Sequence, residues 1–375
     1  MAYRLLGKNV TAPDLHAKVT GKAKYAEDFR ADGMVFAKLL ASPMPHCRVL
    51  RIDASAALAM DGVVGILTAD DVPQSEFGEQ CLTNHPLYEG ESVLAIAAVD
   101  ETTAADAIER VVVDFEPLPF VLNPLDGVRP GSPNARPEGN TQIGRDWATV
   151  KWTEEDFANA PEGSMPMPEG EDKRDTEWSV GDIEAGFAAA DLILDETIVH
   201  QSVTHHPMEP RSAMAYWQNG RLFLHTSTQS LVRTRQAVAS QLDLDIEDLV
   251  MIGEYCGGGF GSKIAFYADE IIASFCSMKL GRPVKWTATR SEGYQATTQG
   301  RDHVQEVELA ATRDGKITGI RCKVWAGMGA YLSTASTGIP TILSGLMYVG
   351  PYDIANVRGD VYGVFNNATP VDAYR

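Results

Sequence analysis

The sequence predicts an α/β (α+β) protein with two ordered regions and an irregular one between them. Strand-like and helix-like patterns alternate over residues 1–125. Proline and glycine then recur over residues 126–178 and apolar periodicity disappears, which is typical of a linker. Alternation returns over residues 179–375. We therefore expect a first domain, a linker without a core of its own, and a second domain over 179–375.

Apolar runs define the elements of the first domain. Asp53 or Ser55 can cap a short helix that Gly62 ends, and a second helix is expected over residues 101–109. The expected strands cover residues 34–41, 48–53, 63–69, 92–99 and 110–116. Together these elements predict one compact α/β unit.

The second domain shows longer elements. The expected helices cover residues 182–190, 230–242 and 264–280, and strands are expected after residue 190, over 221–229 and over 283–288. Gly281 ends the last of these helices. Two long strands then face each other across Arg313-Asp314-Gly315, because Asp-Gly is a favoured pair in tight hairpin turns.

Charge and composition exclude several classes of partner. The net charge of −19 argues against nucleic acid and against anionic membrane surfaces. The five cysteines are widely spaced and odd in number, so they cannot form a complete disulfide framework. The chain contains no run of about 18 apolar residues, and its first ten residues lack the apolar core of a signal peptide. We expect a soluble, cytoplasmic protein.

A glycine cluster is the strongest local motif. EYCGGGFGSK (254–263) follows the apolar run 249–252 and precedes the helix expected from residue 264. A helix N-terminus presents unpaired N–H groups to an anion, and glycines let a ligand approach without a Cβ in the way. Any single glycine here also fits a tight turn without a ligand. The whole cluster favours an anion-binding loop.

Two common anion-binding motifs do not fit this cluster. A P-loop requires Gly-Lys-Ser/Thr, but Lys263 follows Ser262 and precedes Ile264. The dinucleotide fingerprint GxGxxG would require glycine at one of these same positions, 262 or 264. A nucleotide-binding dehydrogenase that uses the loop alone is therefore disfavoured.

GGGFGSK (257–263) instead resembles the GGGFGxK signature of a family of molybdenum enzymes. It is the family of xanthine dehydrogenase, aldehyde oxidase and carbon monoxide dehydrogenase large subunits, which bind the molybdenum cofactor. Residues 18–29 and 41–63 resemble its N-terminal a/b hammerhead domain, and HQSVTHHPMEPRSAMAYW (200–217) resembles its hxPMEPRxAxAxW segment. Further landmarks follow in order at residues 226–229, 312–331 and 350–375.

The resemblance implies a fold, cofactors and partners. It implies a hammerhead domain over 1–125 and the first molybdopterin-binding domain over 179–375, incomplete at its C-terminal side. It also implies a molybdenum cofactor, in the cytosine dinucleotide form, that hydroxylates aldehydes or N-heterocycles with oxygen from water. An FAD-binding medium subunit and a 2Fe-2S small subunit would carry the electrons. A C-terminal companion half of the large subunit, in the same chain or in another, would complete the site.

The family's site residues carry over to matching positions. The cofactor-binding loop would comprise Gly257, Gly258, Gly259, Phe260 and Gly261. The backbone N–H groups of its last three residues would face oxygen ligands of the metal. Gln229 would donate to one such ligand, and Arg375 would lie near metal and substrate. Without the resemblance, Gln229 is a strand-end surface residue and Arg375 a solvated terminal charge.

Three further features refine this hypothesis. His205 and His206 are adjacent and point to opposite faces of an extended segment, so a protein-ligated metal is not expected. Glu209, which follows them, is predicted to be a buried, paired carboxylate. Purine-oxidising relatives place a glutamate where Ile264 stands, which disfavours a purine, and VDAYR (371–375) looks more like the carbon monoxide dehydrogenase subgroup. The substrate stays unassigned.

No catalytic residue is assigned, because the family's base glutamate would lie beyond residue 375. The chain alone is therefore expected to be inactive. The alternative is a non-catalytic interaction or assembly subunit of the same fold. The intact Gln229 and GGGFG motif count against that alternative, since loss of the chemistry should affect them first.

Overall fold

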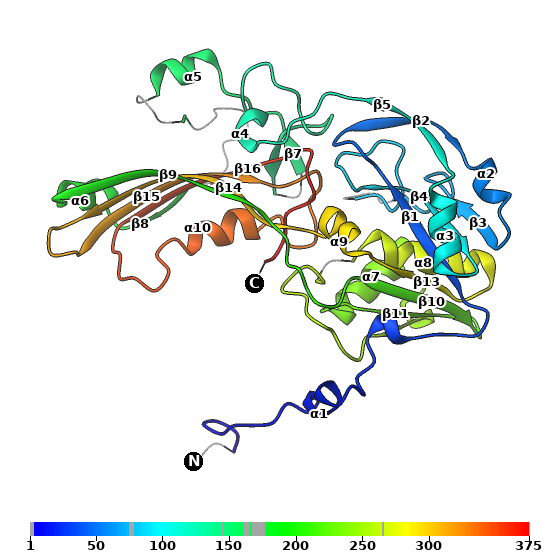
Figure 1. Ribbon diagram of the computed structural model, residues 1–375. Coiled ribbons are helices and arrows are strands. Elements are labelled where there is room, and N and C mark those ends of the chain that lie inside the picture. The colour runs from blue at the N-terminus through cyan, green and yellow to red at the C-terminus, as the bar shows by residue number, and fades with distance from the viewer. Residues whose placement is uncertain are drawn as a thin grey trace.

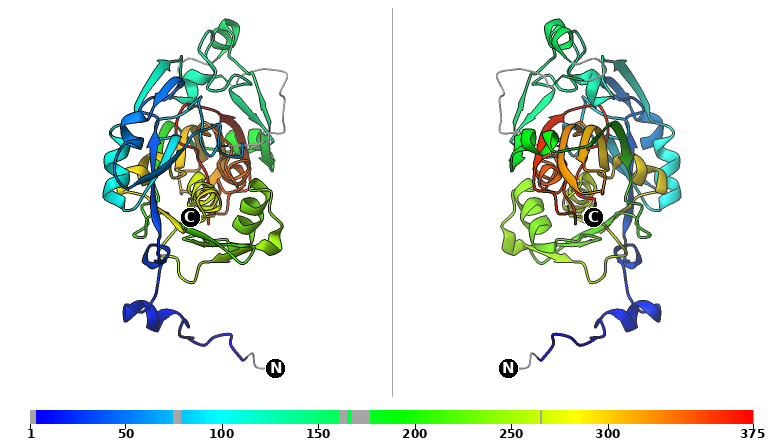
Figure 2. Two further views of the ribbon diagram at one scale, coloured as in Figure 1. Left: turned by 90° about the vertical axis from the view of Figure 1, so that its right-hand side faces the viewer. Right: turned by 90° about the vertical axis from the view of Figure 1, so that its left-hand side faces the viewer.

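The computed structural model of the chain describes residues 4–74, 79–144, 146–160, 165–166, 177–264 and 266–374. Two seven-stranded sheets and a two-stranded ribbon form its framework (Figure 1). The C-terminal end lies between the two sheets, whereas helix α1 (Leu15–Val19) lies on an arm that projects from the body (Figure 2). No helix in the described ranges is long and apolar enough to cross a bilayer.

The first sheet joins residues of both predicted domains. Its strand order is β12-β11-β10-β13-β1-β4-β3, and β1 pairs in parallel with β13, with Val35 opposite Val284. The strands are β1 (Val35–Ala41), β3 (Val63–Leu67), β4 (Ser92–Ala98), β10 (Ser212–Gln218), β11 (Arg221–Thr226), β12 (Leu249–Ile252) and β13 (Val284–Thr287). The strands predicted over residues 34–41, 63–69 and 92–99 are confirmed, and they join strands of the second predicted domain in one continuous sheet.

Helices cover this sheet and close its core. α7 (Leu231–Gln241) and α8 (Ala268–Leu280) contribute Val238, Ile271 and Ile272 to a cluster that also holds Trp286 of β13. On the N-terminal side lie α2 (Ser55–Leu58), α3 (Glu101–Ile108) and the ribbon of β2 (Cys47–Asp53) with β5 (Val112–Pro117). As predicted, Gly281 ends α8 in the left-handed conformation.

The second sheet is built on the predicted hairpin. β14 (Gly300–Ala311) and β15 (Ile317–Gly327) pair antiparallel, and Gly315 takes a φ of +88° in the turn between them. The order is β7-β6-β16-β15-β14-β9, with β8 paired to β16. The other strands are β6 (Thr141–Ile143), β7 (Asp146–Ala148), β8 (Glu177–Val180), β9 (Leu192–Val203) and β16 (Val357–Val364).

Part of the predicted linker packs against this second sheet. It contributes α4 (Pro124–Gly127), α5 (Glu154–Asn159) and strands β6 and β7. Trp152 is 1% exposed and meets Trp325 of β15 edge to face, with ring centroids 6.1 Å apart. The segment thus shares its core with the second sheet, since Val128 and Trp152 cluster with Trp325 and its neighbours.

One predicted boundary is wrong in a way that affects the site. Helix α8 begins at Ala268, whereas the apolar pattern predicted a start at residue 264. Tyr267 is the N-cap, and its backbone N–H donates to the carboxyl of Glu270 at 3.0 Å. The glycine cluster therefore does not lie at the N-terminus of a helix. The side chain of Glu270, within α8 itself, caps this helix end. The remaining helices are α6 (Ile183–Ala188), α9 (Arg290–Ala296), α10 (Ser344–Leu346), a π-turn (Ile339–Leu343) and two 3-10 turns (Ala26–Asp28 and Ile246–Asp248).

Candidate functional site: the glycine loop and its groove

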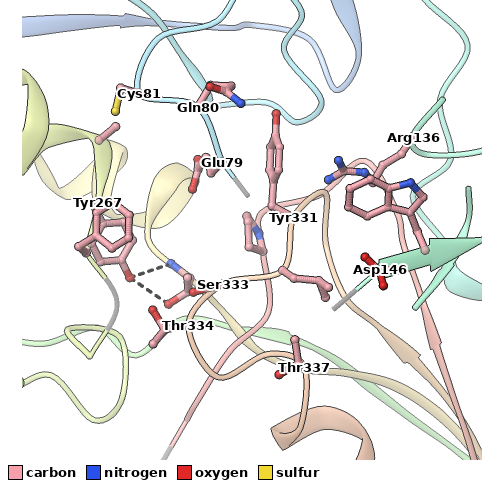
Figure 3. Close-up of a pocket in the computed structure, with 16 residues that line it drawn as sticks. Glu79, Gln80, Cys81, Arg136, Asp146, Tyr267, Tyr331, Ser333, Thr334 and Thr337 are labelled. Carbon is pink, nitrogen blue, oxygen red and sulfur yellow. Dashed lines mark hydrogen bonds between the residues drawn. The ribbon is translucent and has the colours of Figure 1, made fainter. Parts of the chain in front are cut away.

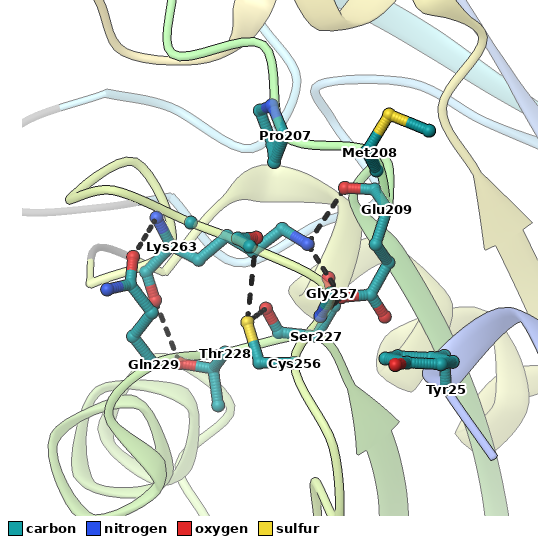
Figure 4. A network of polar contacts seen from close by, with 12 residues as sticks. Tyr25, Pro207, Met208, Glu209, Ser227, Thr228, Gln229, Cys256, Gly257 and Lys263 are labelled. Carbon is teal, nitrogen blue, oxygen red and sulfur yellow. Dashed lines mark hydrogen bonds and ion pairs between the residues drawn. The ribbon is translucent and has the colours of Figure 1, made fainter. Parts of the chain in front are cut away.

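A buried ion pair anchors the glycine loop, residues 257–263 (Figure 4). Lys263 Nζ lies 2.8 Å from Glu209 Oε2 and donates to the Glu209 carbonyl at 2.9 Å. Their side chains are 2% and 6% exposed. The same carboxylate oxygen accepts from Gly257 N at 2.6 Å, so Glu209 holds both ends of the loop. The prediction that Glu209 is a buried, paired carboxylate is confirmed.

Gln229 holds the middle of the loop. It follows β11, and its side-chain oxygen accepts from the backbone N–H groups of Gly261 at 3.1 Å and Lys263 at 3.2 Å. Its own backbone N–H donates to the Lys263 carbonyl at 2.8 Å. Both loop contacts use the amide oxygen, so the orientation of the amide is set. Its NH₂ group donates to no protein group within the described ranges, and the residue is exposed.

Three glycines of the loop are required by contacts within the protein. A Cβ on Gly257 would lie 2.5 Å from Glu209 Cβ, and one on Gly259 would lie 2.1 Å from Gln229 Oε1. A Cβ on Gly261, whose φ is +114°, would lie 2.1 Å from the Ala373 carbonyl oxygen. The glycine pattern predicted that the missing side chains make room for a ligand. The structure shows that these positions are bare because other parts of the chain pack directly on them.

Phe260 is the exception within the loop. Its φ of +56° lies in the left-handed region, which bulky residues rarely adopt. The residue is nevertheless 49% exposed. Strain of about 1–3 kcal/mol at such a residue persists only where the surroundings hold it. The anchored glycines on each side provide that support and present Phe260 to solvent.

Gln229, Phe260 and Gly261 share one groove with a volume of about 1010 Å³. Its facing wall comes from the edge strand β9 and its neighbour β14, and includes His200, Arg301, His303 and Gln305. Its floor is apolar and comes from the π-turn and α10. Ile264 also lines it. The structure thus brings the predicted loop and Gln229 together on one wall.

The chain before Arg375 forms another part of this groove. Arg375 itself lies outside the described residues, but residues 371–374 line the cavity. His205 contacts the Ala373 carbonyl through Nε2 at 2.5 Å, and its ring lies 4.4 Å from the ring of Tyr374. His206 instead contacts Tyr294 Oη at 2.7 Å. The adjacent histidines therefore have different partners, and no group of three metal-binding side chains occurs in the described ranges.

Sequence reasoning missed the polar wall opposite the loop. His200 and His303 are directly paired across β9 and β14. Burial, followed by the charges of His200 and Arg301, lowers the pKa of His303 to about 4, so this imidazole is neutral at pH 7. Arg301 stacks over the Tyr374 ring at 4.9 Å and donates to the Tyr374 carbonyl at 3.2 Å. No local signal marks these residues, because only strand pairing places them at the groove.

Comparison with known proteins identifies the family. The sequence profile described as "Molybdopterin cofactor-binding domain" matches residues 167–375, which is more than half of the chain. The chain belongs to this molybdopterin cofactor-binding family. A second profile, "Aldehyde oxidase and xanthine dehydrogenase, a/b hammerhead domain", matches residues 20–119. The resemblance and the fold class inferred from the sequence are both confirmed.

Several relatives of this molybdopterin-binding chain are large subunits. The carbon monoxide dehydrogenase large chain of Hydrogenophaga pseudoflava is 30% identical over 94% of this chain and 43% of its own length. The nicotinate dehydrogenase large molybdopterin subunit of Eubacterium barkeri is 27% identical over 100% of this chain and 82% of its own length. Reconstituted CO dehydrogenase from Oligotropha carboxidovorans superposes with a TM-score of 0.79 at 28% identity, covering 98% of this chain and 45% of that one. The chain thus spans less than half the length of most relatives it matches.

Proposed function

We propose that this chain forms one wall of the active site in the large subunit of a molybdenum hydroxylase. The enzyme would oxidise an aldehyde or an N-heterocycle with oxygen derived from water. The observation that carries this proposal is the amide of Gln229, whose oxygen is occupied by the glycine loop while its NH₂ group stays available at the groove. A neutral donor fixed in this way suits a negatively polarised oxygen ligand of a metal.

The residues at the groove fit a molybdenum cofactor. When bound, the cofactor would supply the redox chemistry and the activation of water. Gln229 would donate to it. The Phe260 N–H, which has no acceptor in the described part of the chain, would donate beside it, whereas the Gly261 N–H is already used by Gln229. The resemblance implied three N–H donors, at Gly259, Phe260 and Gly261. The Gly261 N–H is no longer among those available to the cofactor.

Substrate and partners follow from the same assignment. Ile264 gives this wall an apolar contact where purine-oxidising relatives carry a carboxylate, so an apolar aldehyde or heterocycle fits better than a purine. The cytosine dinucleotide form of the cofactor, an FAD-binding medium subunit, a 2Fe-2S small subunit and a companion half of the large subunit complete the proposal. The Eubacterium relative, matched over 82% of its length, supports a large subunit divided between two chains.

Substitution of Gln229 tests the assignment. Gln229→Glu keeps the side-chain oxygens that accept from Gly261 and Lys263 but loses the amide donor and places a negative charge at the groove. We expect the complete protein to contain about one molybdenum per large subunit by elemental analysis, with a cytosine nucleotide released by acid. Gln229→Glu should lower the molybdenum content at unchanged thermal stability. Gln218→Ala, which alters another exposed glutamine at a strand end, is the control.

Two results would contradict the proposal. A fully assembled complex that contains no molybdenum would favour the non-catalytic assembly subunit. Full molybdenum content and activity in Gln229→Glu would show that this amide does not face the cofactor.

A further inference from the structure

A second cavity lies beside the groove and is not used by the proposed function (Figure 3). It has a volume of about 370 Å³, which suits a small organic molecule. Phe266 and Pro370 line it, whereas their near neighbours Ile264 and Val371 line the groove. We call this cavity the side pocket. It is enclosed by parts of the chain that lie far apart in the sequence, including Arg136 of the predicted linker.

Arg136 is a buried cation whose ion pair, with Glu138, is long and uses only Nε. It is 8% exposed and stacks over the Trp147 ring at 4.3 Å and the Tyr331 ring at 5.2 Å. Nη1 donates to the Ala330 carbonyl at 2.9 Å, and Nε is 3.4 Å from the carboxylate of Glu138, whose side chain is 43% exposed. In the described residues, Nη2 donates to no acceptor. A buried guanidinium whose Nη2 has no acceptor and whose ion pair is long can bind a further anion at the cavity wall.

The acidic groups of the side pocket do not supply this anion. Burial raises the pKa of Glu79 to about 7, and the Glu79 carboxyl accepts a hydrogen bond from Tyr88 Oη. A large fraction of Glu79 is therefore uncharged at neutral pH. Asp146 is exposed, so water screens its interaction with Arg136. The buried charge of the side pocket is thus positive.

The other walls indicate the shape of the ligand. Trp147, Tyr267 and Tyr331 provide aromatic surface, and Figure 3 shows the two tyrosines at the pocket. Ser333, Thr334 and Thr337 place hydroxyl groups along another side. Flat aromatic molecules pack well against such rings, and the planar fork of arginine matches a carboxylate with two parallel hydrogen bonds. We propose that the side pocket binds a small aromatic carboxylate, with its carboxylate on Arg136 and its ring against the aromatic wall.

Calorimetric titration of the complete protein with benzoate tests this proposal. Benzoate should bind at one site per chain, and benzamide, which has the same shape but no charge, should bind at least about tenfold more weakly. Arg136→Gln should weaken benzoate binding by at least about tenfold. Arg129→Gln is the matched control, because it removes the same charge from a side chain that is 47% exposed and does not line the pocket. It should leave benzoate binding unchanged.

A second variant addresses the case in which Arg136→Gln does not fold. Thr334→Trp places a bulky side chain at the rim from an exposed position and should exclude benzoate while the fold is kept. Unchanged benzoate affinity in either folded variant would overturn the proposal. Tighter binding of the cation benzamidine than of benzoate would also overturn it, because Glu79 and Asp146 would then define the site. The readout is binding, so it succeeds or fails independently of molybdenum content.

Discussion

Replacing Gly259 by alanine should detach Gln229 from the glycine loop. The new Cβ would lie 2.1 Å from Gln229 Oε1 and 2.5 Å from its Cδ, so the side chain must leave its position. Gly259 does not have a positive φ, and the backbone therefore adds no strain of its own. Two hydrogen bonds, to Gly261 N and Lys263 N, would be lost. At about 1 kcal/mol each, the free energy of unfolding should fall by about 2 kcal/mol.

A double-mutant cycle with Gln229→Ala isolates this contact. Shortening Gln229 removes the atoms that clash with the new Cβ, so Gly259→Ala should be less destabilising in that background by about 1–2 kcal/mol. Gly293→Ala is the control. Gly293 lies in α9, and nothing lies within 4 Å of the position that a Cβ would take there. Alanine at this position should stabilise the helix by about 0.5–1 kcal/mol. Urea unfolding measures all four variants. Additive effects of Gly259→Ala and Gln229→Ala would refute the reasoning.

Three further predictions concern the supports of the site. Lys263→Met leaves the Glu209 carboxylate buried without its cation and should lower the free energy of unfolding by about 3–5 kcal/mol. A loss below about 1 kcal/mol in urea unfolding would show that the pair is not buried. Gly261→Ala should destabilise more than Gly259→Ala in the same assay, because it adds left-handed strain to a clash with the backbone of Ala373; the reverse order would contradict this packing. Burial raises the pKa of Glu91 to about 8, above its ordinary value of 4.5, so the unfolded chain loses this proton first as pH rises. The free energy of unfolding should therefore fall between about pH 5 and 8, by up to about 1.4 kcal/mol per pH unit from this group, and Glu91→Gln should reduce that slope. Equal slopes in the two proteins would mean that Glu91 is ionised in the fold.

The site was predictable where its residues belong to one short motif or follow one strand. Gly257 to Gly261 stand out as a cluster, and Gln229 stands at the end of an expected strand. Their chemical assignment came from resemblance rather than from pattern. The contacts that require glycine at these positions were not predictable, because Glu209, Gln229 and Ala373 come from three other parts of the chain. The helix start was misplaced because the apolar pattern continues before the cap, whereas the capping contact between Tyr267 and Glu270 sets the start at Ala268.

The sequence by itself determined the features that depend on neighbouring residues. Gly281 ends α8 and Asp314-Gly315 closes the β14–β15 hairpin because local backbone conformation decides both. Only the tertiary structure decided the pairing of β1 with β13, which merges two predicted domains into one sheet. It also placed His200 and His303 opposite the loop and buried Arg136 between aromatic rings. Contacts of this kind join residues far apart in the chain, and their energies depend on burial that no local pattern records.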